Sequence, residues 1–332
     1  MSRPVLTFFS NKGGVGKTTL VYHVAWMLRE LGRSVVVLDL DPQANLTASF
    51  LGDDRVEQLW SGPERRSVCG GLAPFFAEQG DTGEPHVEEI AFGLGLVPGD
   101  LLLSGAEQDL SLAWASSLDG QPRGLRATAA FATLAQRAAT QADAEIVLVD
   151  VAPNLGSINR AAMIGSDYVV IPLVPDFSSL LVLQTLGPTL RRWRQEWVAR
   201  LDHSPSADFE LPSGQMRPRG YVILERSIRV DRSVGAYDRW LRQIPTEYRR
   251  AVLEEPPSDA PIAVSDDEHC LGLIRPYNSL APLGHEARKP VFLLRSADGA
   301  IGARQRAVHD AYGHFEALTR RLLDVIDLEM AA

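Results

Sequence analysis

Two lysines stand close together in a stretch of small residues near the start of the chain. The stretch runs Ser10-Asn11-Lys12-Gly13-Gly14-Val15-Gly16-Lys17-Thr18-Thr19. Glycines let several backbone N–H groups point into one concavity, where they can bind phosphate oxygens. An ammonium group at Lys17 would reach the β- and γ-phosphates of a nucleotide, and the hydroxyl of Thr18 would ligate Mg²⁺. The predicted chemistry is therefore the binding and transfer of phosphate.

The elements on either side of this loop fit that chemistry. An apolar run from Val5 to Phe9 predicts a buried parallel strand. The residues after the loop predict an amphipathic helix that ends near Gly32, a typical C-cap. One face of this helix carries Leu20, Val24, Leu28 and Leu31. A strand, a glycine-rich turn and a helix form the context that a phosphate-binding loop requires, and the helix N-terminus adds a favourable field for the anion.

The composition supports a special role for the two lysines. Of the 33 basic residues only three are lysines, namely Lys12, Lys17 and Lys289. Arginine has replaced lysine almost everywhere else. A compact ammonium fits between phosphates where a planar guanidinium does not. The pattern therefore indicates that the loop requires lysine itself and not merely positive charge.

Two further apolar runs end in acidic residues. Residues 34–38 lead into Asp39 and Asp41, and residues 146–149 lead into Asp150. Ligands of parallel α/β sheets bind at the carboxyl ends of the strands, which is where these acids would lie. Each run also has a plainer interpretation, because an Asp before a proline often caps a helix and a core strand often ends in an acid. The order and spacing of all three motifs favour a nucleotide site.

The loop departs from the general G-x-x-x-x-G-K-[ST] pattern, because Asn11 stands six positions before Lys17 and Lys12 follows it. It resembles the deviant Walker A motif, K-G-G-x-G-K-[ST], of the ParA/MinD ATPase family. The run Asp39-Leu40-Asp41-Pro42-Gln43 is similar to the switch I motif of that family, D-x-D-P-Q. Residues 146–154 resemble a Walker B strand followed by switch II. The resemblance covers residues 4–190 well and 220–330 loosely.

This resemblance implies a slow, Mg²⁺-dependent ATPase that acts as an ATP-dependent dimerisation switch in the partition or positioning of DNA or protein cargo. An adaptor protein would stimulate its hydrolysis. The fold would be an α/β P-loop domain with a central, mostly parallel sheet and helices on both faces. The cofactors would be ATP and Mg²⁺, with Gly13, Gly14, Val15, Gly16, Lys17, Thr18 and Thr19 at the nucleotide. Lys12 would reach the nucleotide of the second copy in an ATP-dependent homodimer, and Asp41 would position or activate the attacking water. Thr18, Asp39 and Asp150 would support the metal, the two aspartates through water.

The rest of the chain is less specific. We expect one domain over residues 1–332, with insertions at about 51–93 and 202–290, the first of them irregular. Strands are predicted at Gly95–Val97, Tyr168–Val174, Tyr221–Leu224 and Val291–Leu294. Helices are predicted at Leu125–Ala139, Ser178–Leu190 and Ala236–Val252, the last interrupted at Ile244-Pro245, and at the C-terminus up to Ile326.

The charge distribution indicates a candidate partner. The chain has a net charge of −9, but residues 191–250 hold 13 basic and 8 acidic side chains, a net charge of +5. A basic surface of this kind can bind DNA through its phosphates. The candidate residues are Arg191, Arg192, Arg194, Arg226 and Arg229. The competing interpretation is that these arginines pair with acids of the flanking segments or contact a protein partner.

Several function classes are disfavoured. No apolar run approaches a membrane span, and the acids Asp324, Asp327 and Glu329 argue against a MinD-like membrane helix. The chain starts directly with its first strand and has two cysteines, so we expect no signal peptide and a cytoplasmic location. The cysteines lack metal-ligand spacing, which disfavours an iron–sulfur reductase. Two alternatives stay open. One is an ATPase switch that acts through a protein partner without DNA, for example in defence or in MinD-like positioning, and the other is an ATP-dependent metabolic synthetase.

Overall fold

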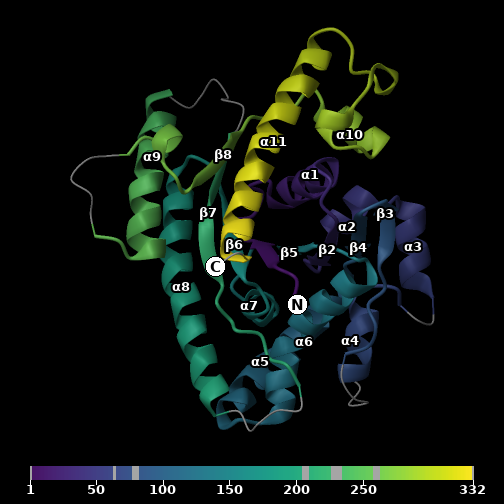
Figure 1. Ribbon diagram of the computed structural model, residues 1–332, viewed down its shortest axis with the longest axis vertical. Coiled ribbons are helices and arrows are strands. Elements are labelled where there is room, and N and C mark those ends of the chain that lie inside the picture. The colour runs from purple at the N-terminus through teal and green to yellow at the C-terminus, as the bar shows by residue number, and fades with distance from the viewer. Residues whose placement is uncertain are drawn as a thin grey trace.

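The computed structural model describes residues 2–62, 65–76, 82–203, 209–225, 234–256 and 262–330. Within these ranges the strands form one eight-stranded sheet with the order β3-β4-β2-β5-β1-β6-β7-β8 (Figure 1). The pair β3–β4 is antiparallel and the other neighbours are parallel. The strands are β1 Val5–Phe8, β2 Val35–Leu40, β3 Glu88–Ala91, β4 Leu94–Val97, β5 Ile146–Val151, β6 Tyr168–Leu173, β7 Arg217–Leu224 and β8 Cys270–Ile274.

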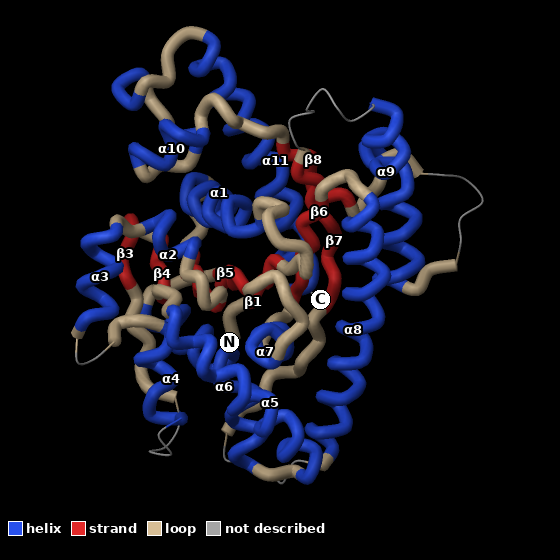
Figure 2. Tube along the Cα trace, turned by 180° about the vertical axis from the view of Figure 1, so that it is seen from behind, coloured by secondary structure: helices blue, strands red, loops and turns tan. Residues whose placement is uncertain are grey.

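Helices cover both faces of the sheet (Figures 1 and 2). Side chains of α1 and α11 belong to the apolar cluster on one face, and those of α5 to α9 belong to the cluster on the other. In the described part of the chain, none of the helices is long and apolar enough to cross a membrane. The helices are α1 Lys17–Glu30, α2 Asn45–Phe50, α3 Asp53–Ser61, α4 Val68–Phe76, α5 Ala106–Ser116, α6 Pro122–Gln141, α7 Ser157–Ile164, α8 Phe177–Asp202, α9 Val234–Glu247, α10 Ala281–Ala287 and α11 Ala303–Met330.

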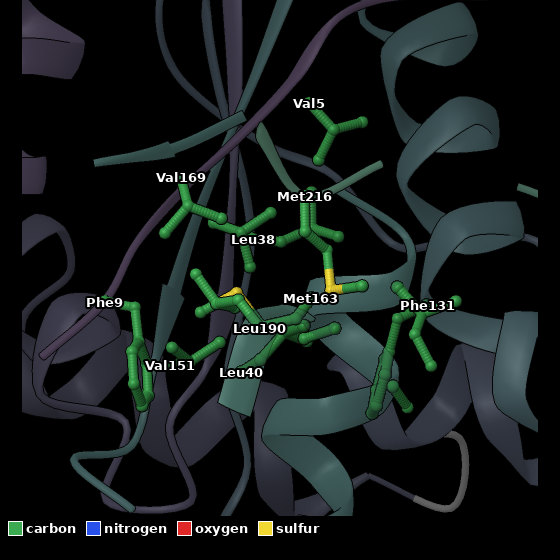
Figure 3. Close-up of a cluster of buried hydrophobic side chains, with 14 of the residues drawn as sticks. Val5, Phe9, Leu38, Leu40, Phe131, Val151, Met163, Val169, Leu190 and Met216 are labelled. Carbon is green, nitrogen blue, oxygen red and sulfur yellow. The ribbon is translucent and has the colours of Figure 1, made fainter. Parts of the chain in front are cut away.

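The central strands explain why the sequence shows continuous apolar runs. All residues of β1, β2, β5 and β6 are buried, because helices cover both of their faces. Successive side chains alternate between the two layers, so Val36 and Leu38 join one cluster while Val35 and Val37 join the other. Figure 3 shows part of the first cluster, to which β2 contributes Leu38, α7 contributes Met163, α8 contributes Leu190 and the segment before β7 contributes Met216. The predicted fold class is confirmed.

The stretch 51–93 is not irregular, as the sequence suggested. It contains α3, α4 and the edge strand β3. Helix α3 buries only Leu59 completely, and α4 holds two glycines and Pro74, so neither shows a strong helical pattern. Tertiary packing stabilises α4, because its Val68 and Leu72 are buried in the core beside α6.

Helix α5 and strand β8 were also not predicted. Strands β7 and β8 show that residues 202–290 contribute to the central sheet.

Three other predictions need correction. Residues 291–294 form no strand; Val291–Leu293 is a 3-10 turn whose first two side chains are buried against α1 and α11. Helix α8 does not end near Leu190 but runs through Pro188 to Asp202. Pro245 does not interrupt α9, which continues beyond Glu247 as a π-helical turn, Tyr248–Leu253.

His23 joins the helix of the phosphate loop to the C-terminal part of the chain. Its Nδ1 donates to the Thr19 carbonyl at 2.7 Å, and its Nε2 accepts from the Val291 amide at 3.1 Å. The ring stacks on Phe315 of α11 with 4.7 Å between centroids. Burial lowers the pKa of His23 to about 4, even though the bond to Thr19 opposes the shift. The arrangement requires a neutral imidazole.

We therefore expect the free energy of unfolding to fall as the pH is lowered from 6.5 towards 4. The unfolded chain binds the His23 proton near pH 6.5, whereas the folded chain binds it only near pH 4. Stability is thus fully present above pH 6.5, and about 3 kcal/mol of it is lost across this window. Urea unfolding at pH 4.5, 5.5 and 7.5 measures the change. A His23→Gln variant should lack this component, a matched His203→Gln variant should keep it, and equal slopes in both would contradict the assignment.

Candidate nucleotide-binding site

The loop between β1 and α1 has the backbone of an anion cradle. Gly14 and Gly16 have φ values of 68° and 96°, in the left-handed region that favours glycine. Gly16 is the N-cap of α1, and a Cβ there would lie 3.4 Å from Leu224 of β7. The conformation therefore explains both glycines, and it places Lys17 and Thr18 in the first turn of α1.

Lys17 and Thr18 meet the acid at the end of β5. The Lys17 ammonium pairs with one carboxylate oxygen of Asp150, and the Thr18 hydroxyl donates to the other at 2.7 Å. Asp150 is fully buried, and Lys17 is only 6% exposed. Burial raises the pKa of Asp150, while Lys17 and Thr18 oppose that rise. The predicted Walker A and Walker B residues are therefore in contact, although 132 residues separate Thr18 from Asp150 in the chain.

The oxygen atoms at this point fit a magnesium ion. Mg²⁺ prefers oxygen ligands and is usually held by one or two carboxylates together with phosphates and water. Two oxygen atoms of this kind, Thr18 Oγ1 and Asp150 Oδ2, lie 2.7 Å apart. Among the described residues no three His, Cys, Asp or Glu side chains are grouped to hold a metal by themselves. We therefore expect Thr18 and Asp150 to hold the ion together with a phosphate ligand.

Asp39 accepts hydrogen bonds from residues that follow β2. It lies opposite Asp150 on the neighbouring strand and is fully buried. Its Oδ2 accepts from the Thr47 amide at 2.8 Å and from the Thr47 hydroxyl at 2.7 Å, and its Oδ1 accepts from the Asp41 amide at 3.3 Å. Burial, followed by the Asp150 charge, raises the pKa of Asp39 to about 7. These contacts give Asp39 a role in ordering the loop after β2, and its role at the metal stays a prediction.

Asp41 lines the main cavity of the site. Its side chain is 5% exposed, and its Oδ1 accepts from the Gln43 amide at 2.9 Å. Ala44 follows with a φ of 51° and precedes the first residue of α2. This tight turn holds the Asp41 carboxylate at the edge of the cavity that the phosphate loop also lines.

Lys12 has a partner within its own chain. Its ammonium pairs with Asp176, the N-cap of α8, and both side chains are mostly buried. Burial raises the pKa of Asp176, but Lys12 outweighs it and holds that pKa below its ordinary value. The Ser179 amide also donates to Asp176 at 3.1 Å. The contact ties the phosphate loop to the start of α8.

Two neighbouring cavities adjoin the loop. The larger, of about 810 Å³, is lined by residues 12–19, Asp41, residues near the start of α3, and His285, Glu286 and Arg288. The smaller, of about 410 Å³, shares Thr19 and His285 with it and extends to residues 274–278. Both volumes are typical of small-ligand sites. The larger cavity is the more polar of the two and lies beside the loop. The smaller cavity, next to it, is more apolar.

The arginines proposed for DNA are not equivalent. Arg191 donates to the Ala251 carbonyl at 2.8 Å and pairs with Glu254 at 2.9 Å. Arg194 donates to the Gln215 and Met216 carbonyls at 2.6 and 3.1 Å, and burial lowers its pKa. Both therefore hold the fold together. Arg192 is exposed. Arg226 and Arg229 lie outside the described residues.

Sequence reasoning missed several residues that order the site. Thr47 bonds Asp39 and accepts from the Gly99 amide at 2.8 Å, and a Cβ at Gly99 would lie 2.8 Å from Asp39 Cγ. Glu107 of α5 accepts from the Ile158 amide at 3.2 Å and so fixes the helix after β5. Among these residues, the run Pro98-Gly99 after a short strand is a signal that was open to use, because a glycine there indicates a close approach of the backbone.

Comparisons with known proteins agree with this geometry. A family model described as an AAA domain matches residues 3–202. The chromosome partitioning protein ParA of Caulobacter vibrioides is 30% identical over 200 residues, which cover 60% of this chain and 66% of that protein. A crystal structure of a Corynebacterium diphtheriae protein has a TM-score of 0.70 at 21% identity and covers 97% of this chain and 98% of its own.

A putative plasmid partition protein from Borrelia burgdorferi, solved with AMPPNP bound, has a TM-score of 0.59 at 17% identity over 97% of this chain and 99% of its own. At such identities the solved structures support the fold alone. The first curated relatives are matched over only 66% of their length. The loop, its partner at the end of β5 and the family match together show that the chain belongs to the ParA/MinD family of P-loop ATPases with a deviant Walker A motif.

Proposed function

We propose that the protein binds ATP with Mg²⁺, dimerises in response and hydrolyses the nucleotide slowly as a switch. The observation that carries this proposal is the contact of Lys17 and Thr18 with Asp150, beside a loop that offers a second lysine. The match to ParA-type relatives supports the same assignment.

Each residue of the site has a separate role in phosphoryl transfer. The backbone amides of residues 13–19 and the Lys17 ammonium hold the phosphate chain, and Thr18 and Asp150 hold the Mg²⁺, whose charge offsets that of the phosphates. Asp41 orients the attacking water from the edge of the cavity. Because the Lys17–Asp150 pair would compete with these contacts, nucleotide binding must exchange it for a pair between Lys17 and phosphate.

Lys12 would act on the nucleotide of the second copy. In this structure Asp176 of the same chain holds it. The pair is partly buried, with side chains 18% and 16% exposed, so the exchange from Asp176 to a partner's phosphate requires little desolvation. We infer that dimerisation replaces one charge partner of Lys12 by another. This would couple dimerisation to the start of α8, where Asp176 is the N-cap.

The same dimer would bind DNA without sequence preference. Because Arg191 and Arg194 serve internal contacts, the proposed surface rests on Arg192 and on the neighbourhood of Arg226 and Arg229. Arg239 and Arg242, one turn apart on α9, are both exposed and follow that neighbourhood in the chain. A few arginines per copy give weak binding that salt screens, and two copies side by side double the contacts. DNA binding would then require ATP.

We expect random duplex DNA to bind at low salt with ATP and not without it, and to dissociate steeply as salt rises. Replacing Arg192, Arg239 and Arg242 by alanine should reduce the slope of log affinity against log salt by about 0.9 for each phosphate that is no longer neutralised. A matched variant with Arg304, Arg306 and Arg320 of α11 replaced should keep the slope. Salt-titrated fluorescence anisotropy measures both. No binding at low salt by an ATP-loaded dimer would refute the DNA function and favour an adaptor protein as the partner.

A further inference from the structure

Helix α10 contributes to the wall of the nucleotide cavity. His285, Glu286 and Arg288 line the same cavity as the phosphate-binding loop. In both Figure 1 and Figure 2, α10 lies next to α1, on the same side as α2 and α3. Arg288 is the C-cap of α10 and is exposed. Its position therefore brings a guanidinium to a cavity that we assign to an anionic ligand.

The Arg288 guanidinium rests on Gly52. A Cβ built on Gly52 would overlap Arg288 Nη2 and would lie 2.5 Å from both Cζ and Nη1. Gly52 has a φ of −78°, which any residue can adopt, so its backbone does not require glycine. The guanidinium thus occupies the space that a side chain at this position would fill. Because Gly52 also lines the cavity, Arg288 links α10 to the start of α3 across two walls of it.

Two features of Arg288 indicate a ligand. Its φ is 49°, a left-handed conformation that is costly for a long side chain and that helix ends usually assign to glycine. Among the described residues, its guanidinium forms neither an ion pair nor a hydrogen bond. Some arginines at this end of the chain do have such partners, for example Arg320 with Glu316. A strained backbone that presents an unpaired charge to a cavity is typical of functional positions.

The residues after Arg288 are fixed relative to the loop helix. Lys289 pairs with both carboxylate oxygens of Asp298 at 2.8 and 2.9 Å. The Val291 amide donates to His23 of α1 at 3.1 Å. Arg288 therefore projects from a support that is anchored to the same helix that carries Lys17, and its approach to a ligand on the loop is preorganised.

We propose that Arg288 closes over the phosphate chain of a bound nucleoside di- or triphosphate, and that its guanidinium packs against Gly52 when no nucleotide is bound. A planar guanidinium donates two parallel hydrogen bonds to phosphate oxygens, which the ammonium groups of the loop do not. Arg288 would thus hold the nucleotide from a wall other than the P-loop and slow its release. This inference rests on the proposed ATP function.

The test compares nucleotide binding by Arg288→Gly with that by wild type. Glycine suits the left-handed backbone, so this variant should fold at least as stably while it lacks the guanidinium. We expect the dissociation constants of Mg-ATP and Mg-ADP to rise about tenfold, mainly through faster dissociation, and that of AMP to rise less. Calorimetry and stopped-flow displacement measure these quantities. Arg306→Ala, an exposed arginine on α11, is the matched control and should bind as wild type does.

A double-mutant cycle tests the contact between the Arg288 guanidinium and Gly52. Gly52→Ala should displace the guanidinium and change the ATP dissociation rate, and this change should vanish in the Arg288→Gly background, because the two residues then no longer interact. If the effects of the two substitutions on the ATP dissociation rate were additive, the proposed contact of Arg288 with Gly52 would be wrong. Unchanged nucleotide release by Arg288→Gly would overturn the whole inference. A wild-type protein that binds no ATP would instead refute the proposed function, so the two failures are distinguishable.

Discussion

Lys17→Ala should abolish measurable ATP binding. The Lys17 ammonium is almost fully buried beside Asp150, at the position where the loop would hold the β- and γ-phosphates. Truncating one partner of a buried, hydrogen-bonded charge pair costs about 2 to 5 kcal/mol, or roughly 30- to several thousand-fold in affinity. Titration calorimetry with Mg-ATP measures the loss. The result would show that the loop binds phosphate through this ammonium.

The same substitution also leaves the Asp150 charge buried with Thr18 as its remaining side-chain partner. Loss of binding could then reflect a disturbed fold, so two controls accompany it. Lys17→Arg retains a positive charge for Asp150, but its planar group does not fit between phosphates, and it should also fail to bind. Lys12→Ala removes the other lysine of the loop and should still bind ATP as a monomer. Hydrolysis at the wild-type rate by pure Lys17→Ala protein would exclude the assignment.

The elements that the sequence predicted well are those with the strongest local reason to form. Strands β1, β2 and β5 are buried on both faces, so their apolar runs are continuous, and each leads into a residue of the site. Helix α1 follows a loop whose glycines end the strand. Such segments need no knowledge of their neighbours to be recognised.

The elements that were missed depend on distant contacts. Strand β8 is five residues long with a central glycine, and it forms because β7 offers it an edge. Helix α4 forms despite two glycines because the core accepts its Val68 and Leu72. Conversely, Val291–Leu293 has a strand-like composition, but its side chains pack under α1 and α11, and among the described residues no strand pairs with it. Local patterns do not contain this information.

The site shows the same division. Spacing identified the loop and the acids at the strand ends, and the structure brings Lys17, Thr18 and Asp150 into contact. The partners of Asp39 and Lys12 could not be predicted, since Asp176 is 164 residues from Lys12 and nothing in its sequence neighbourhood marks it. Arginine-rich composition likewise did not distinguish Arg191 and Arg194, which bind carbonyl groups, from Arg192, which is exposed.

Replacing Asp41 should separate nucleotide binding from hydrolysis. Asp41→Ala should bind ATP normally, because the contacts to the phosphates come from the loop, but it should hydrolyse about 10²- to 10⁴-fold more slowly, the usual effect of losing a general base. The ATP-bound dimer should then accumulate, as light scattering or sedimentation would detect. Asp41→Asn is the matched variant, since its amide oxygen can still accept from the Gln43 amide and hold the turn.

The dimer of this variant also tests Lys12. If Lys12 stabilises the nucleotide of the second copy, Lys12→Ala combined with Asp41→Ala should bind ATP and remain monomeric. Asp176→Asn in the Asp41→Ala background should shift dimerisation to lower ATP concentrations, because it frees Lys12 from the partner that holds it within its own chain. If Asp41→Asn hydrolysed ATP at the wild-type rate, the role of Asp41 would be only to hold the turn after β2. A stable ATP dimer without Lys12 would show that the first lysine of the loop acts only within its own chain, where its pair with Asp176 already gives it a structural role.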